Sequence, residues 1–239
     1  MFNSIWHNVF YDPLYNALVF LISAVPGGDI GLAVILLTII VRFILFPLGK
    51  KAVESQIRMN QIQPELQKIK ELYPTKEEQA KKTMELYKKY KLNPFSGCLL
   101  LLIQLPIIIA LYQVFMKGFS FNTDILYRFV HVPEIMNDKF LGLIDMHAHS
   151  IALALLAGIT QYFQAVIAER RSPKPVEGAK KSFQNDLAKS MNTQMKYVFP
   201  FVVALISYNV SAAVALYWVT TNLFTIGQEL WIQKKLKNL

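Results

Sequence analysis

The sequence has few charged residues and one cysteine, and both shortages restrict what the protein can be. Charged residues make up 17% of the 239 positions and hydrophobic residues 54%, whereas soluble domains average about 25% and about 45–50%. The single cysteine, Cys98, excludes an intramolecular disulfide framework. The hydrophobic residues gather in long uncharged runs, which is typical of a protein that crosses a membrane several times.

Further absences argue against an enzyme. The sequence has no glycine-rich phosphate loop, so we expect no nucleotide cofactor. Ser207 and Ser211 have no histidine or lysine base within their apolar run. His147 and His149 could begin a metal site, but no acidic and histidine partners are suitably spaced, and an interfacial loop is favoured. We therefore expect no catalytic residues, no metal and no cofactor.

The stretch Gly31–Leu48, GLAVILLTIIVRFILFPL, is about long enough to cross the core of a bilayer. Its one charge, Arg42, would cost about 2.5–3.5 kcal/mol in lipid and so is expected to face protein or water. The side chain could also extend to the headgroups. Arg42 precedes the interfacial Lys50 by roughly 12 Å of helix, and this depth favours a water-containing cavity. Thr38 lies one turn earlier on the same face.

The first 29 residues contain no lysine or arginine, and Asp12-Pro13 is expected to break them into two apolar patches. The second patch, Leu14–Val25, would form about 18 Å of helix, which is too short for a bilayer core of about 30 Å. We therefore predict an extracytoplasmic interfacial helix within residues 1–29. The N-terminus has no basic region, so a cleavable signal peptide is not expected.

Uncharged runs in the rest of the chain predict five membrane spans. A polar cluster around Asn209 predicts a turn between the last two of them. The predicted spans are 30–48, 94–116, 149–168, 197–209 and 211–231.

The loops between these spans differ in charge. Residues 49–93 carry eleven Lys/Arg against six acidic residues, and 169–196 carry seven against three. The loop at 117–148 has only three Lys/Arg, while the tail, 232–239, is again basic. Basic segments face the cytoplasm. This pattern predicts an extracytoplasmic N-terminus and a cytoplasmic C-terminus.

Residues 49–93 are predicted to form a cytoplasmic antiparallel helical hairpin. Thr75 and Glu78 have the spacing of a capping box at the start of its second helix. Pro64 is expected to kink or restart the first helix. A charged, solvated linker is the simpler alternative. The apolar stripe expected on the second helix favours a folded hairpin and consists of Ala80, Met84, Tyr87 and Tyr90.

Polar residues recur within the predicted spans and suggest a shared cavity. Gln104 could line it or could bond to a neighbouring helix. We expect no acidic residue within the five spans, and hence no permanent ion pair for Arg42. A wet cavity with one fixed positive charge would suit a passing polar or acidic segment. The polar set comprises Thr38, Arg42, Gln104, Gln161, Gln164, Thr220, Thr221 and Asn222.

The chain resembles the YidC/Oxa/Alb membrane protein insertases from about Asp29 to its C-terminus. Beside the arginine-bearing span and the charged hairpin, NPFSGCLLLLIQLPIIIALYQVF and ALYWVTTNLFTIGQ carry the resemblance in the same order. It implies an all-α polytopic membrane protein, whose five-helix core encloses a hydrophilic groove open to the cytoplasm and lipid. The groove residues that it implies are Arg42, Thr38, Gln104, Gln161 and Trp218.

The resemblance also implies a function and partners. A membrane protein insertase would receive hydrophilic flanks of nascent membrane proteins and release their helices between the third and fifth spans. Its location would be the bacterial inner membrane. The ribosome, the signal recognition particle pathway and the Sec translocon are candidate partners beside the lipid bilayer, and no nucleic acid is expected to bind directly.

The chain departs from some family members in two ways. It has no room for a large periplasmic domain, and its short tail makes docking of a ribosome through the tail doubtful. Two other functions fit the same residues. One is a small transporter or channel for an anionic solute that uses the Arg42 cavity, and the other is a scaffold that only helps membrane proteins fold.

Overall fold

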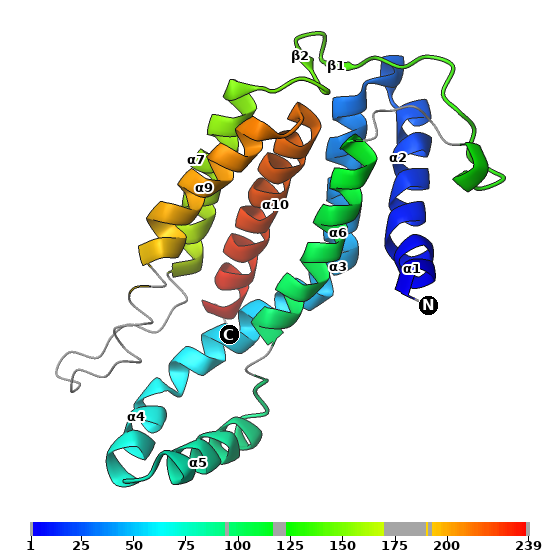
Figure 1. Cartoon of the computed structure of the whole chain (residues 1–239). Coiled ribbons are helices and arrows are strands. Elements are labelled where there is room, and N and C mark those ends of the chain that lie inside the picture. The colour runs from blue at the N-terminus through cyan, green and yellow to red at the C-terminus, as the bar shows by residue number, and fades with distance from the viewer. Residues whose placement is uncertain (1, 94–95, 117–122, 170–189, 191–192, 238–239) are drawn as a thin grey trace.

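The computed structural model describes all residues except 1, 94–95, 117–122, 170–189, 191–192 and 238–239. Most of the described chain is helical, with long helices side by side and a hairpin of two shorter helices, α4 and α5, at one end (Figure 1). The elements are α1 (Phe2–Ile5), η1 (Trp6–Tyr11), α2 (Asp12–Ala24), η2 (Pro26–Gly28), α3 (Ile30–Gln61), α4 (Gln63–Leu72), α5 (Lys76–Lys89), α6 (Ser96–Met116), η3 (Thr123–Ile125), β1 (Lys139–Phe140), β2 (Ile144–Asp145), α7 (Ile151–Glu169), η4 (Gln194–Val198), α9 (Phe199–Asn209) and α10 (Ala212–Lys237).

The N-terminal segment is one continuous helical run, so the expected break at Asp12-Pro13 is wrong. A π-helical turn, η1, immediately precedes the proline, and there the Asp12 N–H donates to the His7 carbonyl. This wider turn accommodates Pro13, which has no N–H and would crowd an ordinary α-helical turn. The run from α1 to α2 measures about 34 Å, so the argument that it is too short to span no longer holds. Its interfacial position stays a prediction.

The first predicted span does not end at Leu48. Helix α3 continues through Pro47 and Gly49 to Gln61, with Pro47 inside it. A proline deletes one backbone hydrogen bond and bends a helix without necessarily ending it. Gly49 is therefore a helical residue and not a flexible joint between the span and the hairpin.

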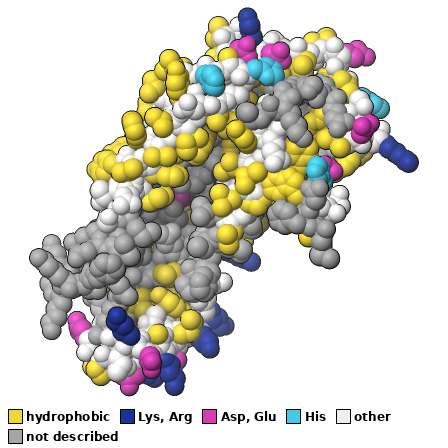
Figure 2. Space-filling view, viewed as in Figure 1, with side chains coloured by type: hydrophobic (Ala, Val, Ile, Leu, Met, Phe, Trp, Pro, Cys, Tyr) yellow, Lys and Arg dark blue, Asp and Glu magenta, His cyan; other side chains and the backbone are white. Residues whose placement is uncertain are grey.

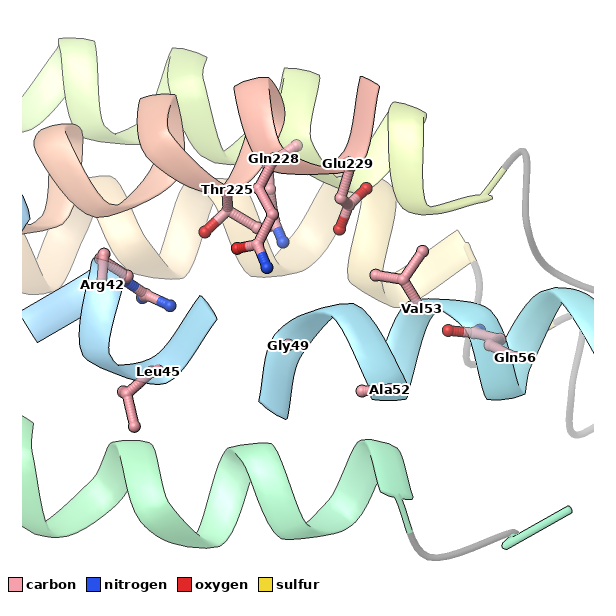
Figure 3. A pocket seen from close by; sticks show the side chains of 10 residues that line it. Arg42, Leu45, Gly49, Ala52, Val53, Gln56, Thr225, Gln228 and Glu229 are labelled. Carbon is pink, nitrogen blue, oxygen red and sulfur yellow. The ribbon is translucent and has the colours of Figure 1, made fainter. Parts of the chain in front are cut away.

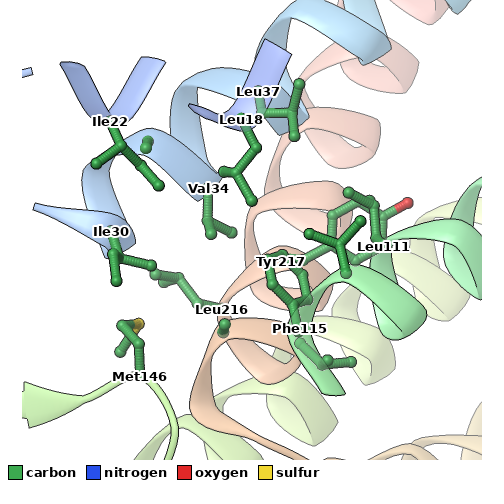
Figure 4. Close-up of a cluster of buried hydrophobic side chains, with 14 of the residues drawn as sticks. Leu18, Ile22, Ile30, Val34, Leu37, Leu111, Phe115, Met146, Leu216 and Tyr217 are labelled. Atoms are coloured by element: carbon green, nitrogen blue, oxygen red, sulfur yellow. The ribbon is translucent and has the colours of Figure 1, made fainter. Parts of the chain in front are cut away.

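The main hydrophobic core lies where α2, α3, α6 and α10 meet (Figure 4). Helix α2 is part of this core, because it packs along α3 and buries its apolar face there. The loop that precedes α7 closes one end of the core with a fully buried methionine. The residues labelled in Figure 4 are Leu18, Ile22, Ile30, Val34, Leu37, Leu111, Phe115, Met146, Leu216 and Tyr217.

Helices α7, α9 and α10 form a second packed group. Helix α7 contacts both α9 and α10 along much of its length, around the buried residues Ala157, Val203 and Val219. Gly158 lets α7 approach α9 closely, because a Cβ there would lie 2.9 Å from the Cβ of Ala204. Helix α9 ends at Asn209, which confirms the turn predicted from the polar cluster.

Two buried polar side chains hold the loop between α6 and α7 against the bundle. Asp29 caps α3, since its Oδ1 accepts from the Leu32 N–H at 3.0 Å, and its Oδ2 accepts from the Leu141 N–H at 2.7 Å. Asn16 accepts from the Tyr127 N–H at 2.6 Å and donates to the Ile125 carbonyl at 2.8 Å. Each side chain replaces hydrogen bonds that the loop backbone would otherwise have to make with water.

The hairpin of α4 and α5 confirms the predicted N-terminal cap of its second helix. Its apolar face, however, differs from the predicted one. The Glu78 N–H donates to the Thr75 hydroxyl oxygen at 3.3 Å, and α4 restarts with a proline in its first turn. Of the four residues expected to pack, only Tyr87 joins the apolar cluster, and Leu86 is the buried residue of α5. The Tyr90 hydroxyl donates to Glu65 at 2.5 Å, and this bond raises the pKa of Tyr90. The hairpin cluster consists of Ile62, Leu66, Leu86 and Leu92.

Within the described residues, two helices are long and apolar enough to cross a membrane by length and composition, Ile30–Gln61 and Ile151–Glu169. A shorter apolar helical stretch covers Gln104–Phe115. On the face shown in Figure 2, lysine, arginine, aspartate and glutamate gather toward the two ends of the molecule, and hydrophobic side chains cover the region between them. A band of this kind suits the hydrocarbon core of a bilayer.

Replacing Asp29 by alanine should remove the α3 cap and release the loop at Leu141, at a cost of about 2 kcal/mol. Asp29→Asn is the matched variant, because it keeps one acceptor oxygen, and it should lose about half as much. Thermal unfolding of the purified protein in detergent would measure both variants. Equal stability of Asp29→Ala and the parent protein would contradict the anchoring role.

The hairpin should open more readily than the bundle, because its apolar cluster has four buried residues among those described, far fewer than the core of the bundle. Hydrogen exchange should therefore be faster at backbone amides of α4 and α5 than at those of α3 between Ile30 and Leu45. The amides of α7 provide the internal control. Protection of α5 equal to that of α7 would mean that the hairpin is as stable as the bundle.

Candidate functional site

A cavity of about 200 Å³ lies between α3 and α10, with one side chain from α7 at its edge (Figure 3). Its wall is polar and charged on the α10 side, although both helices are largely apolar. It follows α3 from Arg42 toward the hairpin. The lining residues are Arg42, Leu45, Gly49, Ala52, Val53, Gln56, Gln164, Thr225, Gln228 and Glu229.

Arg42 is half-buried and extends into this cavity beside α10. In the described part of the chain, no carboxylate lies within 4 Å of its guanidinium. A guanidinium has five N–H donors and stays protonated at any physiological pH. The cavity has room for several water molecules, which would satisfy those donors. The geometry thus supports the prediction of a wet cavity, with Arg42 as its fixed positive charge.

Gln228 crosses the middle of the cavity from α10 to α3. Its Nε2 donates to the carbonyl of Phe46 at 3.2 Å, beside the bend at Pro47. Gly49 makes this approach feasible, because a Cβ there would lie 2.7 Å from the same Nε2. A larger residue at this position would require the amide end of Gln228 to move away from the Phe46 carbonyl.

The other residues implied as groove residues lie around the cavity and not in its wall. Thr38 is 1% exposed and donates to the Val34 carbonyl at 2.6 Å. Gln161 reaches the cavity only indirectly, because its Nε2 donates to the Oε1 of the lining residue Gln164 at 2.7 Å. Trp218 packs toward α7 and α9, beside Ala157 and Val203. Among these residues, the structure places only Arg42 in the cavity itself.

Gln104 belongs to a polar layer that sequence reasoning missed. Its Nε2 donates to the Tyr217 hydroxyl at 2.5 Å, and this buried tyrosine lies within electrostatic reach of Arg42. Gln104 therefore bonds to a neighbouring helix, which was one of its two interpretations. Beyond this layer lies the main core of α2, α3, α6 and α10. The polar side chains that extend from the cavity toward the core therefore end near Tyr217.

Glu229 corrects the expectation that no acidic residue lies within the spans. Helix α10 continues past Gln228 without a break, and Glu229 is only 3% exposed on it. Its carboxylate forms part of the wall of the cavity that contains Arg42. The sequence did contain a signal, because Thr225, Gln228 and Glu229 have the i, i+3, i+4 spacing of one helix face.

The remaining polar groups make contacts within loops and between helices. The described residues contain no cluster of three or more His, Cys, Asp or Glu side chains that could hold a metal. His147 lies 3.4 Å from Asp138, and His149 contacts the Val210 carbonyl at 3.1 Å. Both belong to the loop before α7. Asn222 donates to Thr160 at 3.2 Å and thereby joins α10 to α7.

Comparison with known proteins gives a consistent result. Residues 21–238 match the profile of the family described as 60Kd inner membrane protein. The membrane protein insertase YidC of Clostridium tetani is 38% identical over 210 residues, which are 87% of this chain and 84% of that protein. The YidC of Fusobacterium nucleatum is 32% identical, with 94% and 97% coverage. That of Oceanobacillus iheyensis is 31% identical, with 97% and 85% coverage.

A solved structure agrees in fold. The crystal structure titled as an active YidC insertase with its first transmembrane domain resolved has a TM-score of 0.56 and 26% identity. The match covers 92% of this chain but only 46% of that one, so this chain spans less than half of the solved protein. The agreement in sequence across nearly the whole length, together with the helical bundle around an arginine-bearing cavity, leads to one conclusion. This chain belongs to the 60Kd inner membrane protein family, the YidC/Oxa/Alb insertases, and is a bacterial membrane protein.

Proposed function

We propose that the protein inserts other membrane proteins by receiving a hydrophilic flank in the Arg42 cavity and releasing the adjoining hydrophobic helix into lipid. The observation that carries this proposal is a cavity between two largely apolar helices, α3 and α10, that contains Arg42 and has room for several water molecules. Bound water and the Arg42 guanidinium would replace part of the hydration that a polar flank loses inside a membrane. The names of the relatives, membrane protein insertase YidC, support the same function.

The energetics require no chemical fuel. Moving about 20 apolar residues into lipid contributes roughly 6–12 kcal/mol at about 0.3–0.6 kcal/mol each. One charged residue costs about 2.5–3.5 kcal/mol at the centre of a bilayer. A hydrophobic helix can therefore offset a flank with two or three charges. A cavity that keeps those charges hydrated part of the way lowers the barrier without altering this balance.

The route of lateral release follows from which helices are tightly joined. Release between the third and fifth spans would separate α7 from α10, which pack closely and share the Asn222–Thr160 hydrogen bond. Helices α6 and α9 instead lie on either side of α10 (Figure 1). We therefore place the release route between α6 and α9, because no hydrogen bond joins these two helices among the residues that the structure describes.

Nascent membrane proteins are the proposed substrates, and the hairpin of α4 and α5 is the proposed receiving element on the cytoplasmic side. Its segment carries eleven Lys/Arg against six acidic residues, which suits acidic partners and anionic lipid headgroups. The signal recognition particle pathway, the ribosome and the Sec translocon remain candidate partners. The alternative function is transport of an anionic solute through the cavity that Arg42 lines.

Replacing Arg42 by alanine should reduce the integration of substrates with acidic flanks by about fivefold, the size of one partly wet ion pair. Substrates with neutral flanks should lose less. Arg42→Lys keeps the charge but not the planar fork, and it should retain most activity if attraction is electrostatic. Protease protection of one single-span substrate, inserted into liposomes with a series of flanks, would measure this. Equal loss for all flanks in Arg42→Ala would reject charge attraction.

The same liposomes separate the three functions considered. An insertase integrates the substrate unaided, a transporter moves an anionic solute across the bilayer, and a scaffold does neither. Uptake of an anion without integration of the single-span substrate would reject the proposed function.

The proposed topology predicts which side of the membrane each loop occupies. After replacement of Cys98 by serine, a cysteine at Asp124 should react with a membrane-impermeant reagent only from outside. A cysteine at Lys81, in the hairpin, should react only from inside, because basic segments stay in the cytoplasm. Labelling of both positions in permeabilised cells is the control. Labelling of position 81 in intact cells would contradict the five-span arrangement.

A further inference from the structure

Two pairs of aromatic side chains join α3 to α10. The ring centroids of Phe43 and Phe224 are 5.1 Å apart, and those of Phe46 and Trp231 are 5.7 Å apart. Phe43 is 62% exposed and Trp231 is 49% exposed. On α10, between Phe224 and Trp231, a Cβ at Gly227 would meet no atom within 4 Å. These four rings therefore form an open aromatic strip along the border of the two helices, and the proposed function does not use it.

The aromatic strip is placed to contact lipid. Further exposed apolar side chains accompany it on the same helices, Ile44 on α3 and Leu223 and Leu230 on α10. Apolar surface of this kind favours contact with hydrocarbon over contact with water, and this chain is a membrane protein. Tryptophan is enriched where a membrane meets water. Trp231 belongs to the end of α10 that lies toward the hairpin (Figure 1) and thus marks the headgroup level on that side.

Each of the two helices carries a lysine one turn beyond the second aromatic pair. Lys50 follows Phe46 by four residues on α3, and Lys235 follows Trp231 by four residues on α10. Residues with this spacing share a helix face, so each lysine lies about 6 Å further along the helix on the side of its ring. The Lys235 Nζ is 5.4 Å from the centroid of the Trp231 ring. Because α3 and α10 run in the same direction (Figure 1), both lysines lie on the hairpin side of the ring pair.

Both ammonium groups can donate hydrogen bonds to a ligand. The Lys50 Nζ lies 3.7 Å from a carboxylate oxygen of Glu54, which is beyond the range of a hydrogen bond. Lys235 is exposed and rests against the face of a ring, which attracts its charge without accepting conventional hydrogen bonds. No carboxylate in the described part of the chain lies within 4 Å of the Lys235 ammonium. An ammonium group has three N–H donors, so both lysines keep donors for an anion.

We propose that the aromatic strip, together with Lys50 and Lys235, binds an anionic phospholipid of the leaflet on the hairpin side. The charged headgroup lies at the two lysines, and an acyl chain covers the aromatic strip. Basic positions between spans on the cytoplasmic side bind anionic headgroups in this way. The bound lipid bridges α3 and α10, the two helices that enclose the Arg42 cavity. It therefore stabilises their contact, because a ligand that binds only the assembled helices favours the assembled state.

The charges of the position select an anionic lipid over a zwitterionic one. Lys50, Lys235 and the neighbouring Glu54 carry a net charge of +1, two positive charges against one negative. The headgroup of phosphatidylcholine carries its own cation beside the phosphate, which this net charge does not favour. Phosphatidylglycerol has the phosphate without that cation. A soluble phosphate has the same charge but no acyl chain, so it leaves the aromatic strip uncovered and does not gain the hydrophobic contact.

The experiment uses Trp231 as a reporter in the full-length protein. Trp6→Phe and Trp218→Phe leave it as the single tryptophan. The protein is reconstituted in phosphatidylcholine vesicles that contain a rising fraction of phosphatidylglycerol with brominated acyl chains, which quench tryptophan fluorescence on contact. Brominated phosphatidylcholine is the reference. Half-maximal quenching should need about fivefold less of the anionic lipid, the attraction of about one net charge near a membrane surface. Identical quenching by the two lipids would overturn the proposal.

Two double variants with the same net charge test the position of the site. Lys50→Gln with Lys235→Gln should abolish the preference for the anionic lipid. Lys51→Gln with Lys234→Gln is the matched control, because each of these exposed lysines is the chain neighbour of a proposed ligand but points about 100° away around its helix. The control should keep most of the preference. Equal loss in both double variants would indicate diffuse attraction to a basic surface, and no loss in the first would exclude its lysines. Either result would overturn the proposal.

Thermal unfolding gives a second measure that needs no tryptophan replacement. In nonionic detergent, added phosphatidylglycerol should raise the unfolding temperature of the parent protein more than phosphatidylcholine does, and Lys50→Gln with Lys235→Gln should remove this difference. A difference that persists in that variant would contradict the proposed site. Neither measurement involves insertion of a substrate, so a negative result leaves the proposed function intact.

Discussion

A guanidinium that stays charged in the middle of an apolar bundle is the constraint on which the rest of this structure depends. Arg42 has no carboxylate partner among the described residues, and its charge is costly in lipid. Water must reach it, and water requires a cavity. Helices α3 and α10 leave that cavity between them, and Gly49 lets Gln228 bridge its middle. Around the cavity, the tight packing of α7 on α10 and the core beyond Tyr217 limit how far water can extend.

The fold follows from the sequence to a large extent because its strongest signals are local. A span is recognised by uncharged length, a cap by Thr75 with Glu78, and a turn by the polar residues around Asn209. The predictions failed where the same local sequence signal is compatible with two structures, a kinked helix or a broken one. The chain was expected to break at Asp12-Pro13 and the first span to end at Leu48, but a π-helical turn joins the helices before Pro13, and α3 continues through Pro47. Tertiary packing decides between a kink and a break, and the sequence alone does not contain that packing.

The candidate site was only partly predictable. Arg42 was recognisable because a lone charge in an apolar run has few explanations. Thr38 and Trp218 were placed with it by resemblance, yet the first is capped by its own helix and the second faces α7 and α9. The direction of a side chain around a helix depends on which neighbours pack there. Glu229 was overlooked although it lies within the predicted span 211–231, because the uncharged run itself stops at Gln228, whereas the helix and its burial continue.

The continuity of α3 has a mechanical consequence. The helix that carries Arg42 continues without a break through Gly49 to the start of the hairpin of α4 and α5. A continuous helix that tilts at one end also tilts at the other. Gln228 contacts α3 at Phe46, next to Pro47, and is the point about which α3 would tilt. A load on the hairpin is therefore delivered to the wall of the cavity, while a hinge at Gly49 would have absorbed it. The position of the hairpin and the width of the polar cavity are therefore geometrically coupled.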